Sequence, residues 1–172
     1  MTPLLVPSAF EPRGKRPPPD RKPWMRLWSI RHSALMERLY IRCEAALVRI
    51  GPLFARIGYD RLERPVARLE RSVKGFLFDC RMCGDCALSK AGMSCPMNCP
   101  KAMRNGPCGG VRANGNCEVY AEMPCVWVKA WEGSRAMQGG DAIAEIQPPL
   151  NHAGKGASTW LRVARERARA ET

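Results

Sequence analysis

Eight of the nine cysteines in this 172-residue chain fall between positions 80 and 125. They are Cys80, Cys83, Cys86, Cys95, Cys99, Cys108, Cys117 and Cys125. Eight thiols make two sets of four, and four thiolates are the ligand set of a cubane iron–sulfur cluster and of many structural zinc sites. This segment and the proline-rich ends leave little of the chain for a conventional hydrophobic core. The cysteines therefore predict two metal sites, most economically two [4Fe–4S] clusters.

The spacing of the cysteines favours iron–sulfur clusters over zinc. Cys80, Cys83 and Cys86 form a CxxCxxC run, in which three thiolates converge from consecutive tight turns and Gly84 permits an unusual turn. Zinc sites more often show two CxxC pairs about 15–20 residues apart. Zinc stays the alternative metal. The spacing does not determine which four cysteines bind each metal centre. We expect the CxxCxxC run to share one centre with a distant cysteine, either Cys125 or Cys99, and the remaining four cysteines to bind the other.

The absence of export signals in the sequence favours metal ligation by the cysteines over disulfide bonds between them. The first ten residues are interrupted by two prolines, and no stretch approaches the roughly 20 apolar residues that a membrane span needs. We therefore expect a cytoplasmic protein with no membrane partner, in a compartment that keeps thiols reduced. Cys43 lies on a helical apolar stripe and is interpreted as a buried apolar residue.

Helical periodicity dominates the chain before the cysteines. Apolar residues recur at three- and four-residue steps from Trp24 to Ile50, and Gly51–Pro52 is expected to end this helix. A second stretch, expected to be regular from about Pro65, carries Leu62, Val66, Leu69, Val73 and Phe76 on its apolar face. Two such helices can close an antiparallel hairpin. Trp24 and Trp28 are either interface anchors for a larger partner or part of the core.

The predicted fold class is mainly α with a loop-rich cysteine domain. It combines the N-terminal helical hairpin with a compact iron–sulfur segment whose cysteines are arranged as in ferredoxins, and with a short C-terminal helix capped by Ser158 or Thr159. Five segments are expected: a basic proline-rich arm (1–23), a helical docking region (24–78), the metal domain (79–133), a linker (134–157) and the C-terminal helix (158–172). Trp127 and Trp131 either shield a cluster from water or pack against a partner.

The positive charge belongs mainly to the N-terminal part. Residues 1–79 hold 16 Lys and Arg against 8 Asp and Glu, which gives +8 of the total +12. These basic residues are spread among apolar ones at helical spacing, and few aromatic residues are interleaved with them as a single-strand nucleic-acid platform would require. The pattern weighs against nucleic acid, although a zinc-ribbon nucleic-acid binder stays a lesser alternative.

As a string, the segment from FDCRMCGDC to PCVW resembles the cysteine-rich methylenetetrahydrofolate reductase C-terminal domain. The resemblance covers roughly residues 76 to 133, and NGPCGG followed by GNCEV and PCVW carries most of it. In that family the domain occurs in a small subunit beside a larger catalytic one. The resemblance implies a partner subunit with a TIM-barrel fold and a flavin, FMN or FAD, that converts methylenetetrahydrofolate to methyltetrahydrofolate. Members of the family have been considered both zinc-bearing and iron–sulfur-bearing.

The chain itself is not expected to be an independent catalyst. A TIM barrel needs about 250 residues with alternating strands and helices, and neither is present. There is no glycine-rich nucleotide loop, no paired carboxylates in a catalytic context, and no histidine beside a candidate nucleophile. The resemblance therefore implies an accessory subunit of a reductase complex in one-carbon metabolism, which either transfers electrons to or from the partner's flavin or supports the assembly.

Overall fold

Helices make up most of the regular structure. The computed structural model describes residues 23–170, and the described part contains five α-helices, three short 3-10 helices and no β-strand. The elements are α1 (Pro23–Arg31), α2 (Ser33–Ile57), α3 (Tyr59–Phe78), η1 (Pro96–Asn98), α4 (Val126–Ser134), η2 (Gly140–Ala144), η3 (His152–Gly154) and α5 (Thr159–Ala170). The predicted mainly α class is confirmed for these residues. The predicted N-terminal arm lies outside them, apart from its last residue.

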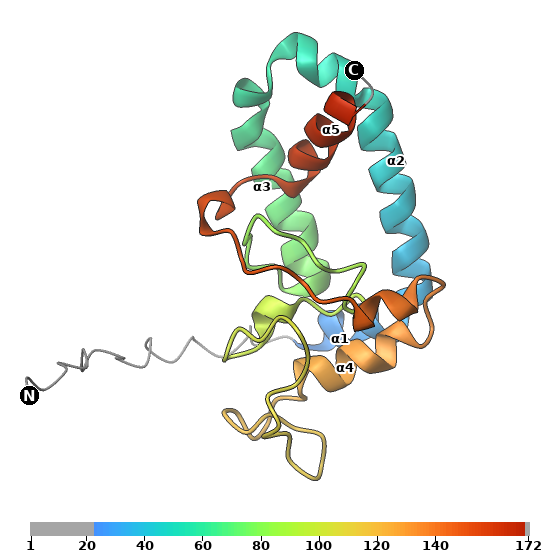
Figure 1. Ribbon diagram of the computed structural model, residues 1–172, viewed down its shortest axis with the longest axis vertical. Coiled ribbons are helices and arrows are strands. Elements are labelled where there is room, and N and C mark those ends of the chain that lie inside the picture. Colours follow the sequence, from blue (N-terminus) through green and yellow to red (C-terminus); the bar gives the residue numbers. More distant parts are fainter. Residues whose placement is uncertain (1–22, 171–172) are drawn as a thin grey trace, which may run out of the picture.

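Helices α2 and α3 run in opposite directions and splay apart, and α5 lies between them (Figure 1). The predicted helix boundaries were wrong at His32 and at two prolines. The single helix expected from Trp24 to Ile50 is divided at His32 into α1 and α2. Helix α2 continues past Pro52 to Ile57, and α3 begins at Tyr59, ahead of Pro65. A proline inside a helix removes one backbone donor, which packing of the rest of the helix can offset. Gly51 is buried where Ala164 of α5 approaches, so its missing side chain allows the two helices to meet closely.

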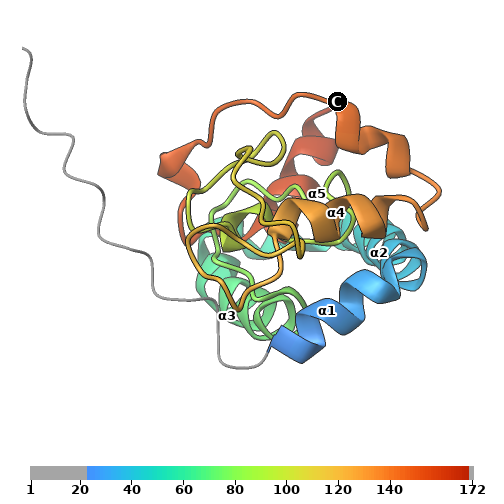
Figure 2. The same cartoon turned by 90° about the horizontal axis from the view of Figure 1, so that it is seen from below.

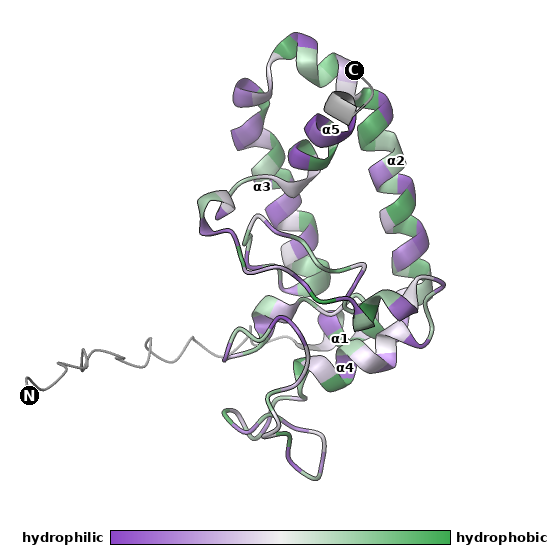
Figure 3. Cartoon of the chain, in the orientation of Figure 1, coloured by the Kyte–Doolittle hydropathy of each residue, from purple (hydrophilic) through white to green (hydrophobic). Residues whose placement is uncertain are grey.

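The apolar face predicted for α3 does not face the interior. Leu69, Val73 and Phe76 are exposed, Phe76 to 62% of its surface, whereas Glu70 and Lys74 are buried. Helix α5 packs against α3 on the side that carries the two charged residues. Figure 3 shows how hydrophilic and hydrophobic residues are interspersed along α3. None of the helices in residues 23–170 has an apolar stretch long enough to cross a membrane.

The cysteine segment lies against one end of this helical frame as a chain of loops, and α1 and α4 pack against each other beside it (Figure 2). Its interior is small and rich in methionine and cysteine. One buried group contains Met36, Phe78, Leu88, Met93, Cys95, Met97 and Met137, and another contains Cys99, Cys117, Met123 and Val126. The predicted loop-rich character of this segment is therefore observed.

The segment after α4 returns the chain to the helical frame. Two backbone N–H groups, of Gln138 and Gly139, each donate to the Glu37 carboxylate of α2 over 2.8 Å. The chain then passes the cysteine loops and enters α5, where the Ser158 hydroxyl accepts a hydrogen bond from the backbone N–H of Leu161 over 3.2 Å. This contact is an N-terminal helix cap, as the sequence predicted for Ser158.

Candidate metal centres

The eight cysteines divide into two sets of four, and each set lines its own cavity. The first cavity, with a volume of about 400 Å³ that includes space open to solvent, is lined by Cys80, Cys83, Cys86 and Cys95. Met82, Leu88 and Met97 add apolar side chains to its wall, and Glu70, Lys74, Asp85 and Arg104 add charged ones. Loops place three of these thiols, and Cys95 follows a buried stretch that runs from Ala91.

The second cavity is lined by Cys99, Cys108, Cys117 and Cys125, with a volume of about 330 Å³ on the same measure. Its wall is largely apolar and includes Met123, Val126 and Trp127. The charged residues in its lining, Lys101 and Glu118, form an ion pair with each other. An isolated antiparallel bridge between Asn116 and Pro124 holds the loop that presents two of the four thiols.

The division corrects the partition expected from the sequence. Cys95 completes the first set, whereas Cys99 and Cys125, the residues favoured for that place, line the second cavity. Cys43 is half-buried on α2 and lines neither cavity. Within residues 23–170, no three Cys, His, Asp or Glu side chains come close enough together to hold a single metal ion. What the thiols of each set share is the cavity that they line.

Electrostatics link the members of the first set. Burial raises the pKa of the Cys95 thiol, and the neighbouring Cys80, Cys86 and Cys83 raise it further. Burial likewise raises the pKa of Cys80 to about 11, against the effect of a hydrogen bond from the Met82 backbone N–H. Thiols that raise one another's pKa give up their protons readily only when a cation neutralises the resulting charge. The donor set thus fits a positively charged metal group.

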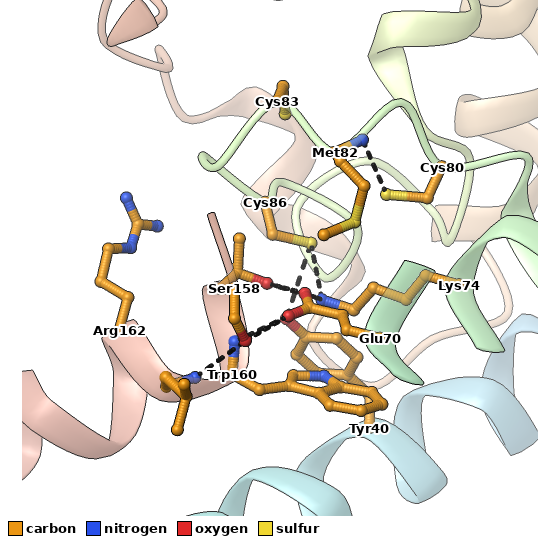
Figure 4. A network of polar contacts seen from close by, with 12 residues as sticks. Tyr40, Glu70, Lys74, Cys80, Met82, Cys83, Cys86, Ser158, Trp160 and Arg162 are labelled. Carbon is orange, nitrogen blue, oxygen red and sulfur yellow. Dashed lines mark hydrogen bonds and ion pairs between the residues drawn. The ribbon is translucent and has the colours of Figure 1, made fainter. Parts of the chain in front are cut away.

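A buried polar network connects the first cavity to the C-terminal helix (Figure 4). The Glu70 carboxylate accepts hydrogen bonds from Lys74 Nζ and Ser158 Oγ, each over 2.7 Å, and from the Thr159 hydroxyl. It also accepts one from the Trp160 backbone N–H over 3.2 Å. Glu70 and Lys74 are only 1% and 2% exposed. A single carboxylate on α3 therefore both pairs with a buried ammonium and binds the first turn of α5.

Two side chains of this network reach a candidate ligand. Lys74 Nζ and the Tyr40 hydroxyl each donate a hydrogen bond to Cys86 Sγ over 3.7 Å. Burial lowers the pKa of the Lys74 ammonium, but Cys86 and Glu70 outweigh this effect and hold the pKa above its ordinary value. Burial also raises the pKa of Tyr40, and Cys86 raises it further. Lys74 therefore stays positively charged, and Tyr40 keeps its proton, beside this sulfur.

Two arginines, Arg26, which is buried, and Arg104, which is partly buried, interact with the residues of the same cavity. Arg26 on α1 is 4% exposed, and burial lowers the pKa of its guanidinium while Asp79 and Cys95 oppose that effect. In the described part of the chain, Nη1 of Arg26 and Nε of Arg104 have no hydrogen-bond partner. Arg104 pairs through Nη2 with Asp85 over 2.9 Å. Buried cationic donors with unused N–H groups beside thiols fit an anionic four-thiolate centre, whose net charge is negative.

Close backbone contact holds the loop of the first cavity to the segment before α5. Gly84 has φ +77°, and a Cβ there would lie 1.9 Å from the carbonyl oxygen of Gly154. The Gly156 N–H donates to the Met82 carbonyl over 2.8 Å beside this contact. No other residue type fits at position 84 without displacing one of the two chains.

We expect Gly84→Ala to lower the free energy of unfolding by about 2–5 kcal/mol, because a positive φ costs about 1–2 kcal/mol and an overpacked contact about 1–3 kcal/mol. Gly115→Ala is the matched control, since Gly115 has φ +80° with nothing within 4 Å of its Cβ position. Urea unfolding followed by circular dichroism measures both variants. An equal cost for the two substitutions would show that the contact with Gly154 is unimportant.

The two tryptophans expected either to shield a metal site or to pack against a partner differ in their environment. Trp127 is buried, lines the second cavity and donates from Nε1 to the Met103 carbonyl over 3.0 Å. Trp131 is 58% exposed and lies away from the cavity lining. Trp24 and Trp28 are also exposed, which excludes the core as their place and leaves the interface interpretation standing as a prediction.

Sequence reasoning missed the residues around the first set of cysteines that are not cysteines. Tyr40, Glu70 and Lys74 lie 46, 16 and 12 positions before Cys86, on helices whose charged residues were expected to face solvent. The four-residue spacing of Glu70 and Lys74 is the one signal that could have indicated a pair. It does not reveal burial, because the same spacing is common on exposed helices. His32 and His152 are exposed and line neither cavity.

Comparison with known families gives one match. A family model described as the C-terminal region of methylene-tetrahydrofolate reductase matches residues 59–153, more than half of the chain. The matched range contains all eight cysteines of the two cavities, together with Glu70 and Lys74, but not Tyr40 or α5. No curated protein and no solved structure matches the chain.

Proposed function

Since the chain belongs to the methylene-tetrahydrofolate reductase C-terminal family, we propose that it is the non-catalytic small subunit of a methylenetetrahydrofolate reductase complex. Its two cysteine sets would hold two [4Fe–4S] clusters, and its partner would be the catalytic subunit, a TIM barrel that carries FMN or FAD. The clusters, when bound, supply one-electron transfer to or from that flavin. The division of eight cysteines between two cavities is the observation that carries the proposal.

The lining of the two cavities supports clusters over zinc. A tetrahedral zinc site needs four sulfurs that close around one ion at about 2.3 Å each. A cubane cluster places four irons and four sulfides between the cysteine sulfurs and so needs a space for them. Cys80, Cys83, Cys86 and Cys95 border such a space, and the second set borders another. A zinc-bearing scaffold of the same complex is the alternative that experiment has to exclude.

The short connection between the two sets supports a relay. Cys95 and Cys99 belong to different sets but are separated only by η1. Four residues of chain span at most about 14 Å, so two clusters bound here would be close neighbours. Proximity of that kind is what electron transfer from one cluster to the other requires.

Exposed apolar side chains support a role as a subunit. Leu69, Val73 and Phe76 form a stripe at helical spacing on the outer face of α3, and Trp24 and Trp28 are exposed on α1. Aromatic and aliphatic side chains of this size are typical anchors of protein interfaces. The catalytic subunit is the partner that we propose for them.

Metal and sulfide analysis of anaerobically purified protein tests the proposal. We expect iron and acid-labile sulfide sufficient for two clusters, and visible absorbance that dithionite bleaches. Cys108→Ala is expected to lose about half of the iron, because it removes a ligand from the second set alone. Colourless protein with stoichiometric zinc would refute the electron-transfer role and favour the scaffold.

A further inference from the structure

The two cavities differ in the charge and hydrogen-bond donors that face their sulfurs. At the first cavity, Lys74 Nζ and the Tyr40 hydroxyl donate to Cys86 Sγ, and the Met82 backbone N–H donates to Cys80 Sγ over 3.4 Å. At the second cavity, the wall consists mainly of prolines and apolar side chains, and its lysine and glutamate neutralise each other.

The charged side chains around the first cavity form ion pairs, and in the pair of Glu70 and Lys74 the positive member lies nearer to a cysteine sulfur. Glu70 directs its carboxylate to Ser158, Thr159 and Trp160 of α5, whereas Lys74 Nζ lies between that carboxylate and the Cys86 sulfur. Asp85 likewise pairs with Arg104 and, over 3.6 Å, with Arg162. Arg26 adds a further buried guanidinium, and the charges of Asp79 and Cys95 act to stabilise its ionised form. The donors nearest the sulfurs are therefore positive or neutral.

Reduction of a four-thiolate [4Fe–4S] centre adds one electron and no proton, so its net charge changes from −2 to −3. Positive charge and hydrogen bonds to the sulfurs stabilise the more negative state and raise the reduction potential. The effect is large in a buried site, because little water screens the charges. Lys74 and Tyr40 are mostly buried, which places both donors to Cys86 in this regime.

We infer that the first cavity holds the cluster of higher potential, and that Lys74 and Tyr40 set this potential through Cys86. The inference rests on the proposed function, since it requires two clusters. It assigns a tuning role to residues that are not ligands and that lie on helices α2 and α3, outside the cysteine segment. Glu70 holds Lys74 in place and, as an anion, acts on the potential in the opposite direction.

A redox titration with dithionite under anaerobic conditions, monitored by electron paramagnetic resonance, tests the inference. Wild-type protein is expected to show two separate midpoint potentials. Lys74→Met should decrease the equilibrium constant for reduction of the higher-potential cluster at least tenfold. For one electron, this lowers the midpoint potential by about 59 mV or more. Glu70→Gln keeps a polar group of the same size but removes the negative charge, so it should raise the same midpoint. A purely structural role would not give opposite signs.

Tyr40→Phe serves as a milder variant, because it removes only one neutral donor and leaves the ion pair intact. It should lower the higher midpoint by less than Lys74→Met does. Lys129→Met is the matched control: Lys129 pairs with Glu132 on α4, is partly exposed and lines neither cavity. Neither midpoint should move in that variant.

The outcomes separate the inference from the proposed function. Iron-loaded protein in which Lys74→Met and Tyr40→Phe leave the higher midpoint unchanged, or move the lower one, would overturn the inference alone. Two coincident midpoints in the wild type would do the same. Protein that contains no iron would overturn the proposed function, and the inference with it. Should Lys74→Met fail to fold, the shift in Tyr40→Phe decides the question.

Discussion

The double variant Cys83→Ala/Cys95→Ala is expected to retain about half of the wild-type iron and sulfide, whereas Cys83→Ala/Cys99→Ala is expected to lose nearly all of both. Cys83 and Cys95 line the same cavity, so the first double variant disables one site twice and leaves the other complete. Cys99 lines the second cavity, so the other double variant disables both sites. Metal analysis and acid-labile sulfide per protein chain measure the difference.

This comparison holds the number of removed thiols constant, so it separates the partition from a general loss of cysteines. Cys43→Ala is the control and should retain the full iron content, because Cys43 lines neither cavity. If Cys83→Ala/Cys95→Ala loses all of its iron, then either the two sites do not form independently or the division of the cysteines is wrong. The single variant Cys95→Ala distinguishes these two cases, since dependent sites would empty together in it as well.

Glu70→Ala is expected to lower the free energy of unfolding by about 3–5 kcal/mol, the cost of leaving one member of a buried ion pair without its partner. Lys74 would keep its charge at 2% exposure, and the N-terminal turn of α5 would lose the carboxylate that binds Ser158, Thr159 and Trp160. Urea unfolding at neutral pH measures the loss. Glu132→Ala removes the acid of an exposed pair and should cost about 0–1 kcal/mol.

The pH dependence of this effect follows from the pKa shifts. The pKa of Glu70 is lowered in the folded protein: burial raises it, but Lys74 and the hydroxyls of Thr159 and Ser158 outweigh burial. A carboxyl group with a lowered pKa contributes stability above its unfolded pKa of about 4.3, and this contribution is lost as the pH falls through the folded value. The difference between wild type and Glu70→Ala should therefore narrow under acid conditions. A constant difference down to pH 3 would contradict the ion pair.

The sequence predicted the composition of the candidate centres but not their grouping. Each of the eight cysteines lines one of the two cavities, and the loops that carry them follow from the glycines and prolines between them. Spacing could not show that Cys95 joins Cys80, because the chain between them passes through a buried turn that brings the two thiols back together. The path of the loop therefore determines which thiols share a cavity. The order of the cysteines along the chain does not reveal this path.

The helical segments were predicted, but their boundaries and the faces that they bury were not. Apolar periodicity identified α2, α3 and α5 and grouped Leu69, Val73 and Phe76 on one face of α3. It did not show that this face is exposed and that Glu70 and Lys74 are buried. An apolar stripe indicates that one face of a helix will be buried. It does not indicate whether the same chain or a partner protein buries that face. The polar face of α3 can be buried because Ser158, which caps α5, and Thr159 at the start of α5 donate hydrogen bonds to the Glu70 carboxylate.

By itself, the sequence determined the number and type of candidate ligands, the mainly helical class and the family, because these depend on residue identity and on local spacing. Only the tertiary structure decided which four thiols share a cavity, and which distant side chains reach a sulfur. Tyr40, Lys74 and Cys86 come from α2, α3 and a loop, and they meet because α5 and the cysteine loops close on the same end of the helical frame. Contacts of this range depend on how the helices pack, and no local pattern specifies them.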